Sequence, residues 1–441
     1  MNQALLFSFI DLISIGFWFT ILLFIANSLK QKYYLENLNQ YFYLGWGFKV
    51  GFAVLFALIY LFYLGGGDIN AYWDSATALN KLLISNPSAY FQEIWNTDRL
   101  QGIALHFNTE TGFPPGWIWR ETEAWNASKL LSILSIVTFN SFWCATLLLS
   151  SLVFFISWML LYRIHSEGVF GVKSLAFAFL FLPSVTFWCS GISKDSQVYA
   201  LALFLIFLMF EWLKWNPERR GITRLILLVI VFYILYQLRH FVALSIVVPF
   251  VSALAVRFGN RWSERPIILW VFRIVVLAMI IVGFIYLSDA NATQKMIQEA
   301  QIIQTDFSQN PIYTGAKYEI TSMDGSITSL FLAIPEAVFI ALYRPFITEN
   351  IGGNFLINQI ESLIFILFTI AFVFNRNLFT NVRSLIKNEF AVFSLIFVLL
   401  IAFMAGYTSI LFGVLVRIRA IALPFFFLLL TYRSVQPKHI E

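Results

Sequence analysis

Long apolar runs recur along almost the whole chain and are separated by short polar stretches. A helix that crosses the roughly 30 Å hydrocarbon core of a bilayer needs about 20 apolar residues. Eleven runs approach or exceed this length, so the pattern predicts eleven transmembrane helices. They cover residues 4–28, 44–65, 139–162, 174–192, 196–213, 222–238, 241–256, 266–287, 355–374, 390–411 and 413–432.

The charged residues of the loops predict how these helices are oriented. Lysine and arginine gather in the cytoplasmic loops of membrane proteins. With the N-terminus outside, the predicted inner loops and C-terminal tail hold 16 Lys and Arg in 69 residues, whereas outer loops 66–129 and 289–326 hold 6 in 102. The asymmetry requires that a further apolar stretch, residues 327–346, enters the membrane or lies along it without crossing. The C-terminus is then expected inside.

The composition excludes other classes of protein. Hydrophobic residues make up 59% of the chain and charged residues 12%, against about 25% charged residues in soluble domains. Cys144 and Cys189 fall in apolar runs, which predicts core residues rather than metal ligands or redox groups. The net charge of +5 is explained by the inner loops, so no nucleic-acid partner is expected.

These features predict an all-α, polytopic integral membrane protein with a single transmembrane domain over residues 1–441. The first apolar run lacks a basic start and an A-x-A cleavage site, so it is expected to remain as a membrane helix. Loop 66–129 is expected to contain interfacial helices. Residues 289–354 are expected to form a second outer loop together with the segment that does not cross.

The sequence Gly-Gly-Gly-Asp-Ile-Asn-Ala-Tyr-Trp-Asp-Ser-Ala follows the second predicted span at residues 65–76. Asp68 suits the N-cap of a helix that continues past this sequence. A carboxylate at the boundary between water and membrane is also partly desolvated, which raises its basicity toward that of a general base. We therefore consider Asp68 a catalytic candidate, followed by Asp74.

Basic residues lie at the predicted outer ends of several spans. Each group alone is weak evidence, because an exposed ion pair explains Lys194 and membrane anchoring explains Arg239, His240, Arg417 and Arg419. Together they suit a phosphate or pyrophosphate on a polyprenyl lipid, because arginine binds phosphate oxygens in a bidentate manner. The predicted phosphate-binding residues are Lys194, Arg239, His240, Arg344, Arg417 and Arg419, and the predicted sugar or acceptor contacts are Tyr72, Trp73, Trp188 and Glu349.

Glycosyl transfer from a lipid phosphate needs a carboxylate base and groups that stabilise the leaving phosphate. The pattern Asp68-x-x-x-Tyr72-x-x-x-Ala76 resembles the first-loop signature of the GT-C superfamily of polyprenyl-phosphate-sugar glycosyltransferases. Residues 187–195 and 343–346 resemble multi-pass proteins of bacterial surface-polysaccharide systems. The resemblance implies a GT-C fold, a catalytic role for Asp68 and a place in the bacterial cytoplasmic membrane.

In the GT-C family the signature usually follows the first span, whereas here it follows the second predicted span. An additional N-terminal helix is therefore expected. The implied partners are a polyprenyl-phosphate donor, a glycan or lipid-linked acceptor, and membrane lipids. No cofactor and no metal ligands are predicted, although a divalent ion on acidic residues stays open.

Two other functions remain open from the sequence. An O-antigen-polymerase-like or ligase-like enzyme acting on undecaprenyl-pyrophosphate glycans would depend on the outer-face arginines more than on Asp68. A transporter without chemistry would place charged residues near the middle of spans. Glu361 lies inside a predicted span, where it could pair with Arg344 or mark a proton path.

Overall fold

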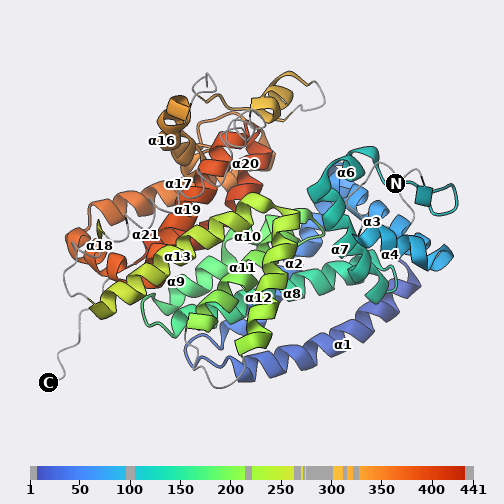
Figure 1. The fold of residues 1–441 in the computed structure, drawn as a ribbon, viewed down its shortest axis with the longest axis horizontal. Coiled ribbons are helices and arrows are strands. Elements are labelled where there is room, and N and C mark those ends of the chain that lie inside the picture. Colours follow the sequence, from blue (N-terminus) through green and yellow to red (C-terminus); the bar gives the residue numbers. More distant parts are fainter. Residues whose placement is uncertain are drawn as a thin grey trace. The chain divides into compact units, whose positions relative to one another are not determined.

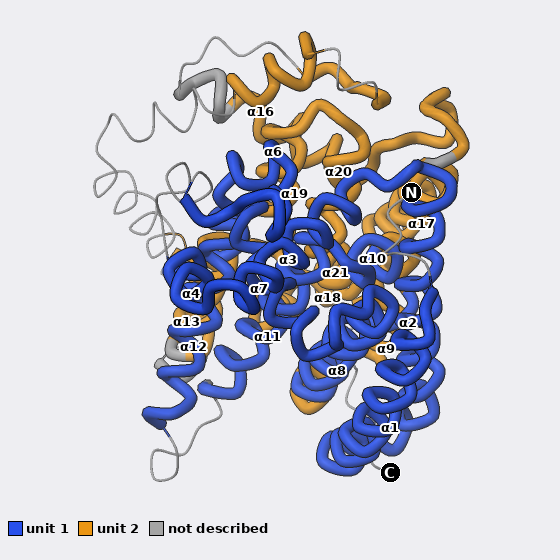
Figure 2. The backbone as a smooth tube through the Cα atoms, turned by 90° about the vertical axis from the view of Figure 1, so that its right-hand side faces the viewer, with its two compact units in different colours: residues 1–163, 179–181, 185–243 blue, residues 164–178, 182–184, 244–441 orange. Residues whose placement is uncertain are grey.

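The computed structural model describes residues 7–95, 105–213, 221–262, 270, 271, 274, 301–310, 315–320 and 327–432. Within these residues the chain is helical, apart from an isolated antiparallel bridge between Lys317 and Leu411. The chain divides into two compact units (Figure 2). Unit 1 comprises residues 1–163, 179–181 and 185–243, and unit 2 comprises residues 164–178, 182–184 and 244–441.

The predicted spans are represented by long apolar helices. Among the described residues, eight helices are long and apolar enough to cross a bilayer, which confirms a multi-pass membrane protein at this level. They are α1 (Phe9–Lys32), α2 (Tyr41–Leu58) with its π-helical continuation η2 (Ile59–Tyr63), α8 (Phe142–His165), α11 (Lys194–Leu213), α12 (Gly221–Leu238), α13 (His240–Trp262), α17 (Leu356–Val373) and α19 (Glu389–Thr408).

Two of the predicted spans have a different form. Residues 174–192 are broken into α9 (Val172–Ala176), η3 (Phe177–Phe181) and α10 (Pro183–Trp188), because the residue before Pro183 takes an extended conformation. Residues 413–432 form α20 (Phe412–Arg419) and α21 (Leu423–Leu430), which are bent by 67° and would together make a ninth span. Residues 327–346 form the shorter helix α16 (Ile327–Tyr343). The predicted span 266–287 falls almost entirely outside the described residues.

Four helices occupy the described parts of the first long loop of unit 1. It contains α3 (Asp68–Ser85), α4 (Pro87–Trp95), α6 (Gly116–Arg120) and the start of α7 (Thr122–Val137), and α3 packs along α7 (Figure 1). Their interface is polar: the Ser132 hydroxyl donates to the Asn80 side-chain oxygen over 2.7 Å. Both side chains are buried. A buried interface with satisfied hydrogen bonds gives α3 a fixed register on α7.

Three consecutive glycines direct the chain from η2 into α3. Gly65, Gly66 and Gly67 have φ angles of +72°, +119° and +66°, which residues with a side chain rarely adopt. Gly67 occupies the N-cap, so Asp68 is the first residue of the helix and not its cap as expected. A carboxylate in the first turn still interacts favourably with the helix dipole.

Unit 2 contains α16 to α21 as well as α9. Helix α16 packs closely on α19, where Gly406 faces the backbone of Ala337. Small residues allow membrane helices to approach in this way. A short amphipathic helix, α18 (Leu378–Lys387), connects α17 to α19.

Candidate functional site

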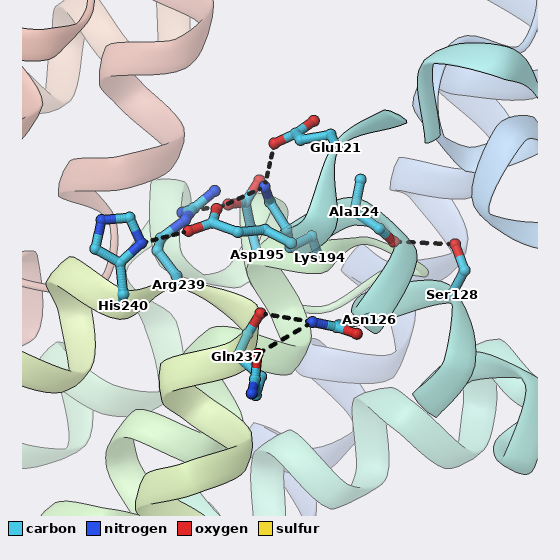
Figure 3. A network of polar contacts seen from close by, with 10 residues as sticks. Glu121, Ala124, Asn126, Ser128, Lys194, Asp195, Gln237, Arg239 and His240 are labelled. Atoms are coloured by element: carbon cyan, nitrogen blue, oxygen red, sulfur yellow. Dashed lines mark hydrogen bonds and ion pairs between the residues drawn. The ribbon is translucent and has the colours of Figure 1, made fainter. Parts of the chain in front are cut away.

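Six ionisable side chains meet in unit 1 at the start of α7, the start of α11 and the turn between α12 and α13 (Figure 3). The α12–α13 turn is as short as the sequence predicts, since α12 ends at Leu238 and α13 begins at His240. We call this set the junction cluster, and it consists of Glu121, Glu123, Lys194, Asp195, Arg239 and His240.

The junction cluster is a connected set of ion pairs. Lys194 Nζ lies 3.0 Å from Glu121 Oε1 and 3.2 Å from Glu123 Oε2. Arg239 Nη1 donates to Asp195 Oδ1 over 2.8 Å, and His240 Nδ1 lies 3.1 Å from Glu123 Oε1. Lys194 therefore pairs with the two glutamates at the start of α7.

The cluster has a buried side and an open side. The side chains of Arg239, Asp195 and Lys194 are 9%, 10% and 11% exposed. Those of Glu121 and His240 are 52% and 51% exposed. A ligand that reaches the cluster would meet Glu121 and His240 first.

The cations of the cluster control the charge of Glu123. Burial raises the pKa of this carboxyl, but its hydrogen bond with His240 and the charges of Lys194 and Arg239 lower that pKa to about 2. Glu123 is thus an anion at any physiological pH. It holds Lys194 and His240 together.

The start of α3 shares the electrostatic environment of the junction cluster. The pKa of the Tyr72 hydroxyl is raised well above its usual value by burial, and then by the charges of Glu121, Asp68 and Asp195, while Arg239 opposes them. Tyr72 also packs edge-on against Trp117, with ring centroids 6.1 Å apart. Five of the predicted site residues therefore belong to one region of unit 1: Asp68, Tyr72, Lys194, Arg239 and His240.

The other aromatic and acidic candidates of unit 1 lie apart from this face. Asp74 is six residues after Asp68, which places it about 120° away around α3. Trp73 is fully buried and packs against Phe142, so its ring belongs to the core. Trp188 ends α10 and packs against Phe56 and Phe187.

A second set of predicted residues gathers in unit 2 around the end of α16. Arg344 Nε donates to Glu349 Oε1 over 2.7 Å, so Arg344 pairs with Glu349 and not with Glu361. Arg419 is fully buried and donates to the carbonyl groups of Ala341 and Arg344 and to the Ser362 hydroxyl. Arg417 is half-buried and lies two residues from Arg419, hence on another face of α20.

Glu361 has a different partner from the one expected. Its carboxylate accepts hydrogen bonds from the backbone N–H of Ser184, over 3.1 Å, and from the Ser184 hydroxyl. Asn358 donates to the same hydroxyl over 2.9 Å. All three residues are buried, so the Asn358 and Glu361 side chains of α17 find their partner in Ser184, at the start of α10.

Sequence reasoning missed Lys49. This lysine of α2 is 1% exposed, donates to the Val185 carbonyl over 3.1 Å and lies 5.2 Å from the ring centroid of Tyr199. A lysine inside a predicted span was itself the signal, because intramembrane charge is costly. Glu121 and Glu123 were also missed, since nothing local in the sequence marks them as partners of Lys194.

The described ranges hold no group of three or more His, Cys, Asp or Glu side chains that could bind a metal ion. No protein-family model, curated protein or solved structure matches the chain. A function must therefore be argued from the geometry of the site.

Proposed function

We propose that the chain is a membrane glycosyltransferase that moves a sugar from a polyprenyl-phosphate donor to an acceptor at the outer face of the membrane. The observation that carries the proposal is the shared electrostatic environment of α3 and the junction cluster. The charges of Asp68, Asp195 and Arg239 all act on the Tyr72 hydroxyl. The resemblance of residues 68–76 to the GT-C first-loop signature supports the same assignment.

Asp68 supplies the base in this proposal. Its carboxylate takes the proton from the acceptor hydroxyl while the acceptor oxygen bonds to the anomeric carbon. The bond between that carbon and the phosphate oxygen breaks, and its electron pair leaves with the polyprenyl phosphate. A half-buried carboxylate in the first turn of α3 suits this role, because it keeps contact with water.

The phosphate binds by exchange in this proposal. Lys194 is already paired with Glu121 and Glu123, so an incoming phosphate competes with them for its ammonium group. Glu121 is the more exposed partner and is the one released. Arg239, held by Asp195, adds positive charge beside the site.

Transfer of label from a panel of radiolabelled polyprenyl-phosphate sugars, in membranes that contain the overproduced chain, tests the proposal. Asp68→Asn should reduce transfer at least about 100-fold, because an amide cannot accept the proton. The matched control is Glu110→Gln, which neutralises an exposed carboxylate of the same loop and should leave transfer unchanged. Transfer that survives Asp68→Asn and disappears in Arg344→Ala would favour the polymerase or ligase instead.

A transporter is favoured by one separate observation. Lys49 and Glu361 are buried inside candidate spans, and Lys49 has no carboxylate in contact among the described residues. Charges at this depth mark substrate or proton paths in transporters. A transporter would move fluorescent polyprenyl phosphate across the membrane of reconstituted vesicles and would transfer no label. This translocation should be lost in Lys49→Met.

A further inference from the structure

Unit 2 contains an apolar pocket of about 240 Å³ that the proposed glycosyl transfer does not use. Its walls come from α16, α17, α18, α19 and α21, and every lining side chain is apolar. Leu395 and Leu399 of α19 belong to the lining and are 44% and 42% exposed. The pocket is therefore open at the surface of a membrane helix, where lipid chains are the surrounding solvent.

Helix α18 forms one wall of this pocket and presents two kinds of surface. Its side chains Leu385 and Ile386 line the pocket. Phe379, on the same helix, is 88% exposed. An amphipathic helix with exposed aromatic residues beside transmembrane helices is typical of the boundary between lipid headgroups and acyl chains.

The C-terminal part of this wall is fixed in place. The Ser384 and Tyr432 hydroxyl groups are hydrogen-bonded, which ties α18 to the residues that follow α21. Glu389, at the start of α19, forms an ion pair with Arg257, whose Nη1 lies 3.6 Å from its Oε1. The pocket is thus part of the fold and does not depend on a mobile segment.

The charged residues of this segment are all basic. Residues 374–388 contain three basic residues and no acidic residue. Arg376 and Arg383 are exposed and take part in no ion pair within the described part of the chain. Arginine binds phosphate oxygens in a bidentate manner, and basic segments at a membrane surface attract anionic lipids.

We propose that this pocket and the arginines of the 374–388 segment form a binding site for one anionic phospholipid. One acyl chain occupies the pocket, and Arg376 and Arg383 bind the phosphate-containing headgroup. The charge asymmetry of the loops assigns this segment to the cytoplasmic leaflet, which is the leaflet rich in anionic lipids. The site is independent of the glycosyl-transfer proposal.

Native mass spectrometry of the purified full chain, with added phosphatidylglycerol or phosphatidylcholine of the same acyl composition, tests the site. The unmodified chain should retain phosphatidylglycerol in preference to phosphatidylcholine. Each arginine should account for about five-fold of that preference, so Arg376→Gln/Arg383→Gln should abolish most of it. Lys173→Gln, an exposed basic residue of unit 2 outside the segment, is the matched control and should keep it.

A pocket-filling variant tests the acyl-chain part separately. Leu395→Trp should reduce retention of both lipids, because the larger ring occupies the space of the acyl chain. Leu399→Phe is a smaller change at the same opening. It serves as the pocket-filling variant if Leu395→Trp does not fold. Three results would overturn the proposal. The unmodified chain could retain the two lipids equally, the double variant could keep its preference unchanged, or the pocket variant could retain both lipids fully.

Discussion

A carboxyl group that is largely removed from water normally titrates at a higher pH than in solution, yet Glu123 has a pKa of about 2. Two cations and a histidine overcome the cost of burial at this one position. The same group contributes to the stability of the fold, because its pKa falls when the chain folds.

The difference between the folded and unfolded pKa of Glu123 predicts that the stability of the fold depends on pH. Because the folded pKa lies below the ordinary value of 4.5, Glu123 contributes its full stabilisation above pH 4.5 and loses it as pH falls toward 2. The difference between a pKa of 4.5 and one of about 2 corresponds to about 3 kcal/mol. Glu123→Gln should thus lower the melting temperature in detergent at pH 7 by several degrees.

The measurement is the difference in melting temperature between Glu123→Gln and the unmodified chain from pH 7 to pH 3. The difference should shrink below pH 4.5, since protonated Glu123 resembles glutamine. Glu110→Gln, an exposed glutamate, should show no difference at any pH. A gap between Glu123→Gln and the unmodified chain that stayed constant to pH 3 would contradict the depressed pKa.

At the scale of helices, the close contact of α16 and α19 depends on one glycine. A Cβ at Gly406 would lie 2.0 Å from the carbonyl oxygen of Ala337. The two helices would have to separate, and Ala333, Ala337 and Tyr407 would lose their packing. Gly406→Ala should destabilise unit 2 by about 1–3 kcal/mol.

Thermal unfolding in detergent measures this effect. Gly47→Ala is the matched control: Gly47 also lies inside a transmembrane helix, but a Cβ there would meet nothing within 4 Å. Alanine forms helices better than glycine, so Gly47→Ala should be neutral or slightly stabilising. Similar melting temperatures for the two variants would show that the α16–α19 contact is not as close as described.

The sequence predicts the helices well wherever the apolar run is uninterrupted. The runs at 4–28, 139–162 and 390–411 correspond to α1, α8 and α19 within a few residues, because a membrane-spanning helix must satisfy its backbone internally. The run at 174–192 looks equally continuous, but Pro183 and the extended residue before it break the helix. Hydrophobicity alone does not reveal such a break.

The site was less predictable than the helices. Lys194, Arg239 and His240 stand out because they are charged residues at the ends of apolar runs. Their partners do not: Glu123 precedes Lys194 by 71 residues, and only the packing of α7 against α11 and α12 brings them together. Long-range pairing of this kind leaves no local pattern in a single sequence.

At the scale of the whole molecule, the loop charges predict sidedness, and cysteine labelling can measure it. Both natural cysteines are buried, so a new exposed cysteine gives a clean signal. A membrane-impermeant maleimide should label Glu110→Cys in intact cells and should not label Lys173→Cys until the cells are permeabilised. The reverse pattern would contradict the orientation with the N-terminus outside.

The fully buried Arg419 has a consequence for the order in which unit 2 is assembled. It lies 75 residues beyond Arg344, yet it donates to the carbonyl of Ala341 in the last turn of α16 and to that of Arg344 just after the helix. The carbonyls at the end of a helix have no partner within that helix. The chain is synthesised from its N-terminus, so these carbonyl groups lack their hydrogen-bond partner until α20 has been made. A chain truncated before residue 419 should therefore leave them without that partner.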